Sequence, residues 1–165
     1  RSSDLPRSTQ QFEYNLKSSH YWILKTIMSK RIIALYGHSN CGKSQTLNIL
    51  KSILREKGES LSHNLRYTVD ERETFCYNDK IICITPAGDD AATMQRNIEY
   101  FENHNGDILV TSSRSKGSTR DIIYDYAQSQ CIKVEWKIKS VEYYLGKDIQ
   151  LLCNEKVAEL ILGML

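Results

Sequence analysis

Residues 31–47 read RIIALYGHSNCGKSQTL, and this stretch decides the fold class. Aliphatic residues dominate positions 31–36, which predicts a strand that is buried on both faces. Gly37 and Gly42 then bracket a polar turn. From 44 to 57 leucine and isoleucine recur at helical spacing, and Gly58 follows them as a helix stop. The stretch therefore predicts a buried strand that passes through a glycine turn into a helix.

Strand and helix patterns alternate through the rest of the chain. Two short strands at 74–77 and 80–85, joined by Asn78 and Asp79, predict an antiparallel hairpin. Further strands are predicted at 65–69, 107–111 and 131–138, and further helices at 89–103, 118–128 and 154–165. Ser118 and Asp121 resemble a capping box that opens the second of these helices.

This alternation predicts an α/β fold, with a mostly parallel sheet and helices on both faces in a three-layer α/β/α sandwich. Ligands on such sheets bind beyond the carboxyl ends of the strands. We therefore expect functional residues in the turns that follow Tyr36, Thr85, Thr111 and Ile138.

The length of 165 residues suits one domain, which we place at residues 31–165. Residues 1–30 form an N-terminal extension. Its first part, RSSDLPRSTQQ, is polar and turn-rich, which favours disorder. Residues 12–27 carry apolar side chains that suit a short helix packed on the domain.

Composition excludes some classes of protein. The hydrophobic share of 41% supports a core, and the net charge of +2 does not indicate nucleic acid. No apolar run approaches the roughly 18 residues that a membrane span needs, and no signal peptide is evident. The chain has five cysteines with no Cys-x-x-Cys pair, which predicts buried free thiols in the cytoplasm rather than disulfides or a zinc site.

The turn at 37–44 reads GHSNCGKS and fits the pattern G-x-x-x-x-G-K-[ST] at every fixed position. Glycines let the main chain approach a ligand closely, and successive N–H groups then form a cradle for an anion at the positive end of a helix. The Lys43 ammonium suits phosphate oxygens, and the Ser44 hydroxyl suits Mg²⁺. The predicted ligand-binding residues here are Gly37, His38, Ser39, Asn40, Cys41, Gly42, Lys43, Ser44 and Gln45.

This turn resembles the Walker A loop of the P-loop NTPase superfamily. A chance match in a chain of this length is on the order of one in a hundred. The resemblance implies a P-loop NTPase-like fold, a nucleoside triphosphate with Mg²⁺ as the ligand, and pairing with a protein partner or a second copy of the chain. The N-K-x-D turn that recognises guanine in P-loop GTPases is absent, because residues 139–142 read KSVE. ATP is therefore the default ligand among the nucleoside triphosphates.

A second element of the site is predicted after the strand at 80–85. The run from Thr85 to Gly88 resembles the D-x-x-G turn of P-loop GTPases, with Thr85 where that family has aspartate. Asp89 and Asp90 follow, and we predict that Asp89 helps Ser44 to hold the metal and orients water. The alternative is that both aspartates only cap the next helix. Asp107 begins its strand, at the wrong end of the sheet for a metal ligand.

The basic segment at 111–120 is the third element. It is loosely similar to the arginine-bearing lid of small P-loop kinases, and arginine matches the geometry of phosphate oxygens. We predict a catalytic role for Arg114 and nucleotide binding by Arg120, with Ser112 or Ser113 as an alternative sensor of the terminal phosphate. The alternative is that the segment is a solvated basic loop without a role in ligand binding.

Three functions follow from these residues. The first is Mg²⁺-dependent ATP hydrolysis, in which Lys43, Asp89 and Arg114 stabilise charge and orient water. The second is a small-molecule or nucleotide kinase, which the basic segment favours. The third is a nucleotide-sensing module without catalysis, which the missing aspartate at position 85 favours.

Overall fold

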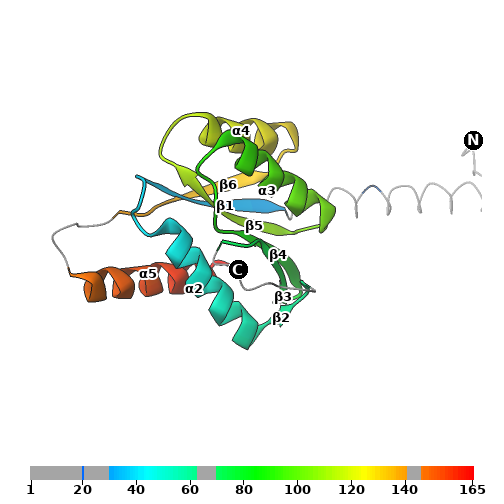
Figure 1. Ribbon diagram of the computed structural model, residues 1–165. Helices are drawn as coiled ribbons and strands as arrows, with labels where there is room; N and C mark the ends of the chain where they lie inside the picture. Colours follow the sequence, from blue (N-terminus) through cyan, green and yellow to red (C-terminus); the bar gives the residue numbers. More distant parts are fainter. Residues whose placement is uncertain (1–19, 21–29, 63–69, 141–145) are drawn as a thin grey trace, which may run out of the picture.

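The computed structural model describes residue 20 and residues 30–62, 70–140 and 146–165. These residues form one six-stranded sheet and four helices (Figure 1). The strands are β1 (Arg31–Gly37), β2 (Glu59–Ser60), β3 (Glu73–Tyr77), β4 (Lys80–Thr85), β5 (Ile108–Arg114) and β6 (Lys133–Ile138). The helices are α2 (Lys43–Lys57), α3 (Ala91–Asn103), α4 (Ser118–Ser129) and α5 (Lys147–Leu162). The predicted strand at 65–69 and nearly all of the N-terminal extension lie outside the described residues.

The sheet is mixed, with strand order β2-β3-β4-β5-β1-β6. The strands β4, β5, β1 and β6 are parallel to one another, whereas β2 with β3 and β3 with β4 are antiparallel. The α/β class and the predicted hairpin are therefore confirmed. In the parallel part, Thr85 pairs with Thr111 and Tyr36 pairs with Ile138, so the carboxyl ends of these strands lie at one edge.

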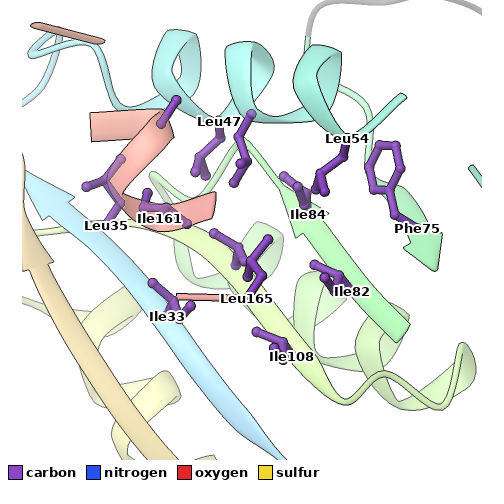
Figure 2. Packing of buried hydrophobic residues seen from close by; sticks show 13 residues of the cluster. Ile33, Leu35, Leu47, Leu54, Phe75, Ile82, Ile84, Ile108, Ile161 and Leu165 are labelled. Atoms are coloured by element: carbon purple, nitrogen blue, oxygen red, sulfur yellow. The ribbon is translucent and has the colours of Figure 1, made fainter. Parts of the chain in front are cut away.

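One face of the sheet is covered by α2 and α5. Alternate residues of the central strands point to this face, as the period of a strand requires. Figure 2 shows the aliphatic side chains of these strands packed against those of the two helices and against Phe75 of β3. The labelled members are Ile33, Leu35, Leu47, Leu54, Phe75, Ile82, Ile84, Ile108, Ile161 and Leu165. This packing holds the start of α2 against the carboxyl edge of the sheet.

The opposite face is covered by α3 and α4 (Figure 1). Ile32 and Ala34 of β1 point to this face and belong to one cluster with Met94 and Phe101 of α3 and Ile123 of α4. Since Ile33 and Leu35 point the other way, β1 is buried on both faces. The prediction from its unbroken apolar run is confirmed.

Helix α5 begins well before the predicted start at 154. It starts at Lys147, and its first turns expose Ile149, Leu151 and Leu152. These side chains break the amphipathic pattern, because they are apolar but do not face the core, and the pattern therefore placed the start too late. None of the described helices combines the length and the apolarity that crossing a membrane requires.

The segment between β5 and α4 also differs from its prediction. Strand β5 continues past 111 to Arg114, so four of the ten residues in the basic segment at 111–120 belong to the strand. The capping box is wrong: Gly117 is the N-cap of α4, and no side chain caps it. Instead, the Thr119 hydroxyl lies 3.2 Å from Ser113 Oγ and accepts a hydrogen bond from the Arg114 N–H at 3.3 Å. These contacts join the first turn of α4 to the end of β5.

All five cysteines are free, as predicted, but they are not all buried. Cys41 and Cys83 lie in the interior, whereas Cys131 and Cys153 are exposed. Burial raises the pKa of the Cys83 thiol to about 11. This thiol is therefore protonated at neutral pH and is a weak nucleophile.

Candidate functional site

The two glycines of residues 37–44, here called the glycine loop, are both required by their surroundings. A Cβ at Gly37 would lie 2.2 Å from the carbonyl oxygen of Lys139, which directly follows β6. Gly42 has φ 91°, and a Cβ there would lie 2.6 Å from Oδ1 of Asn154 in α5. Both distances are far below van der Waals contact, so no other residue fits either position without movement of the backbone or of Asn154.

Lys43 is the first residue of α2, and its ammonium is held inside the glycine loop. Its Nζ donates hydrogen bonds to the carbonyl oxygens of Gly37 at 3.1 Å and His38 at 2.7 Å, and it lies 3.9 Å from Cys41 Sγ. The residue is only 5% exposed. Among the described residues no carboxylate forms an ion pair with it. A buried cation without a counter-ion is costly, and an anion that entered the loop would compensate it.

The other loop residues offer main chain rather than side chain. His38, Ser39 and Asn40 are exposed, and Asn40 adopts a left-handed conformation with φ 59°. Cys41 is buried beneath the loop, next to Lys43. This stretch was predicted to contact a ligand through its main-chain N–H groups, and no side-chain chemistry of His38 or Ser39 is needed.

A pocket of about 220 Å³ opens at the start of α2. Its lining joins the glycine loop to the turn that follows β4, through Asn40, Gly42, Lys43, Ser44, Gln45 and Asp89. The N-terminal N–H groups of the 15-residue helix α2 lie at this position and favour negative charge. The pocket therefore combines an ammonium, a helix terminus, a hydroxyl and one carboxylate.

The carbonyl oxygen of Pro86, which directly follows β4, forms hydrogen bonds to both α2 and β5 beside this pocket. It accepts hydrogen bonds from Ser44 Oγ of α2 at 3.1 Å and from Ser112 Oγ of β5 at 2.5 Å. Ser44 keeps its oxygen lone pairs for another partner while its proton is donated. The exits of β4 and β5 are thereby joined to the residue that follows the motif lysine.

Asp89 and Asp90 were each predicted either to serve the metal site or to cap the next helix, and the structure places them differently. Asp90 is the N-cap of α3, because its carboxylate accepts hydrogen bonds from Thr93 N at 2.8 Å and Thr93 Oγ1 at 2.7 Å. These bonds hold the pKa of the Asp90 carboxyl below its usual value. Asp89 lines the pocket beside Ser44. Asp90 therefore caps α3, whereas Asp89 lies at the pocket.

Asn97 of α3 supports the turn that carries Asp89, and the sequence analysis did not identify it. Its Nδ2 donates to the carbonyl oxygen of Ala87 at 2.7 Å, and its Oδ1 accepts from Arg72 Nε at 2.7 Å. The side chain is 1% exposed. The signal was present, because position 97 belongs to the apolar stripe of α3 that includes Met94 and Phe101. A polar residue inside such a stripe indicates a buried hydrogen-bonding role.

Asn154 of α5 is a second residue that the sequence analysis missed. It is buried, packs against Gly42, and donates from Nδ2 to Gln45 Oε1 at 3.0 Å. The prediction placed the start of the helix at this position, so its inward face was not recognised. Asn154 therefore connects α5 to both the glycine loop and the first turn of α2.

The two predicted arginines are held differently. Arg114 ends β5, pairs in register with Gly37, and is exposed. The Arg120 guanidinium lies over the rings of Trp136 at 4.5 Å and Tyr36 at 5.2 Å, and its Nη1 donates to the Ser115 carbonyl oxygen at 3.0 Å. Neither arginine is among the residues that line the pocket. Their predicted roles toward a nucleotide stay predictions.

Ser44 and Asp89 are the predicted metal ligands, and they share the pocket. A hydroxyl and a carboxylate suit a hard cation such as Mg²⁺, which takes its other ligands from phosphate and water. In the part of the chain that the structure describes, no group of three or more His, Cys, Asp or Glu side chains forms a metal cage. Asp107 lies at the opposite edge, where its carboxylate accepts from Ile81 N at 2.8 Å.

Comparisons with protein-family models, with curated proteins and with solved structures find no match to this chain. Its function is therefore inferred from its residues and their geometry.

Proposed function

We propose that the chain binds a nucleoside triphosphate, by default ATP, with Mg²⁺ at the glycine loop, and that it hydrolyses this ligand. The fold that goes with this function is the three-layer α/β/α sandwich of the P-loop NTPases. The proposal depends on one observation above all. The Lys43 ammonium is buried and has two carbonyl partners but no counter-ion among the described residues, at the positive end of α2. A polyphosphate is the anion that this loop, with its two obligatory glycines, is shaped to receive.

Each residue at the pocket has a distinct task in this proposal. The N–H groups of the loop and of the first turn of α2 hold the phosphate oxygens, and Lys43 turns from the loop carbonyls toward them. Ser44 and Asp89 would hold Mg²⁺, which supplies further neutralisation of charge when bound. Asp89 orients water, and Arg114 stabilises the charge that develops on the terminal phosphate.

A binding module without catalysis is the second candidate, and one observation favours it. Thr85 stands at the end of β4, where the related turn of GTPases has a carboxylate, and it is completely buried. Its hydroxyl has no hydrogen-bond partner among the described residues, and a hydroxyl, unlike a carboxylate, carries no negative charge for a metal ion. In this case the ligand would change the contacts of the site without being cleaved.

Calorimetry with ATP and Mg²⁺ tests the proposal. Replacement of the ammonium in Lys43→Met should weaken binding by roughly a hundredfold, because a buried charge-assisted contact is lost. Lys51→Met is the matched control: Lys51 is a buried lysine of the same helix, but its Nζ donates to the Glu71 carbonyl oxygen, away from the pocket. Equal affinities for the wild type and Lys43→Met, or no binding at all, would refute the proposal.

Release of phosphate separates the candidate functions. The wild type should release phosphate from ATP faster than Lys43→Met does. Tight binding without turnover supports the sensing module. Loss of ATP without free phosphate, dependent on an added acceptor, supports a kinase.

A further inference from the structure

A second pocket adjoins the one at the glycine loop. It has a volume of about 540 Å³ and lies between the beginnings of α2 and α5. Residues of the first two turns of α2 and the first turn of α5 line it, namely Gln45, Asn48, Ile49, Lys147, Gln150 and Leu151. Gln45 lines both pockets. The two pockets therefore adjoin at this side chain.

The lining of this α2–α5 pocket combines aliphatic and amide side chains. Its aliphatic lining comes from Leu151 of α5, which is 51% exposed, and from Ile49 of α2. Aliphatic walls with amide groups beside them suit a flat heteroaromatic ring, which is apolar on its faces and polar on its edge. Lys147 adds one cationic group to the lining.

The side-chain amide of Gln45, which lines both pockets, is held by a hydrogen bond from Asn154. Its Oε1 accepts from Asn154 Nδ2 at 3.0 Å. Because this contact uses the carbonyl oxygen, the Nε2–H groups of Gln45 remain as donors. Asn154 is buried, so the amide is held by a fixed partner.

We propose that the α2–α5 pocket holds the base and ribose of the nucleoside triphosphate whose phosphates occupy the glycine loop. The inference rests on the proposed function and adds that the ligand is recognised through its nucleoside as well as its phosphates. Ile49 and Leu151 contact the faces of the base, and Gln45 donates to the nucleoside. The volume falls within the range of about 300–1,000 Å³ that small-ligand sites occupy.

Calorimetry that compares ATP with inorganic triphosphate, both with Mg²⁺, tests the inference. Leu151→Trp fills the pocket and should weaken ATP binding by roughly tenfold or more, with no change for triphosphate. Leu151→Ala should weaken ATP binding by a few-fold through loss of the apolar wall. The matched control is Leu160→Trp, on the same helix, where the leucine is 70% exposed and lines neither pocket. It should bind both ligands like the wild type.

The two proposals fail in different ways. If the wild type binds triphosphate and Leu151→Trp leaves ATP binding unchanged, the phosphate site stands and the nucleoside pocket is refuted. If Leu151→Trp weakens both ligands equally while Leu160→Trp weakens neither, the substitution has disturbed the phosphate loop and the inference is also refuted. If the wild type binds neither ligand, both proposals fall. Thermal unfolding of each variant verifies that the exposed substitutions leave the fold intact.

Discussion

The glycine loop and the basic segment at 111–120 were both predicted to contact phosphate, but their charged side chains are held by different kinds of contact. In the glycine loop, Lys43 contacts carbonyls five and six residues away, so its position follows from local backbone geometry. In the basic segment, Arg120 of α4 lies over the rings of Tyr36 in β1 and Trp136 in β6, which are distant in the sequence. A motif whose contacts are local predicts its own geometry, whereas a cluster of charges does not.

The largest effect is expected at the loop glycines. Gly37→Ala places a methyl group against the Lys139 carbonyl oxygen, so it should lower the free energy of unfolding by about 3 kcal/mol and abolish ATP binding. Chemical denaturation and calorimetry measure the two effects. Gly146→Ala is the control, because no atom of the described residues beyond its chain neighbours lies within 4 Å of the added Cβ. Wild-type stability of Gly37→Ala would mean that the loop is not held as closely as described.

Asn97 comes next, because it supports the turn that carries Asp89. Asn97→Ala leaves the Ala87 carbonyl and Arg72 without their partner and should cost about 2–3 kcal/mol of stability. It should also slow phosphate release more than it weakens ATP binding, since the turn that carries Asp89 loosens. Tyr100→Phe removes one hydrogen bond, to Thr74, from the same helix and should cost about 1 kcal/mol without a kinetic effect. Equal kinetic losses in both variants would argue against a positioning role.

The neighbouring aspartates should separate stability from turnover. Asp90→Ala removes the cap of α3 and should lower the melting temperature, while Asp89→Asn should lower phosphate release and leave the melting temperature almost unchanged. The pKa of Asp90 is lowered in the folded state, so its stabilising effect is full above the usual carboxyl pKa of about 3.9 and is lost as the pH falls through the lowered value. Melting curves of wild type and Asp90→Ala should therefore converge at low pH. A constant gap would show that the cap does not depend on the charge.

The smallest stability effects are expected at the two arginines. Arg120→Ala should lower the free energy of unfolding by about 1 kcal/mol through loss of its aromatic contacts. Arg114→Ala should leave unfolding unchanged, because the side chain is exposed, and should slow phosphate release. If instead Arg114→Ala lowered stability and Arg120→Ala slowed phosphate release, Arg114 would have the structural role and Arg120 the role in phosphate release.

Local patterns were sufficient for several parts of the molecule. The β3–β4 hairpin follows from Asn78 and Asp79, both of which adopt positive φ in the turn. The α3 cap follows from an aspartate before an amphipathic run. The start of α5 did not follow, because Ile149 and Leu152 are exposed in spite of their apolar character.

The sequence alone determined the strand, the glycine turn and helix α2, because their residues obey the periods of regular structure and the glycines mark the turn between them. It also determined where a phosphate-binding loop is to be sought. Only the tertiary structure decided that Asp89, rather than Asp90, lines the pocket, that Asn97 and Asn154 support it, and that α2 and α5 enclose a second cavity. These relations join residues that are up to 109 positions apart in the chain. They depend on strand order and helix packing, which no local pattern encodes.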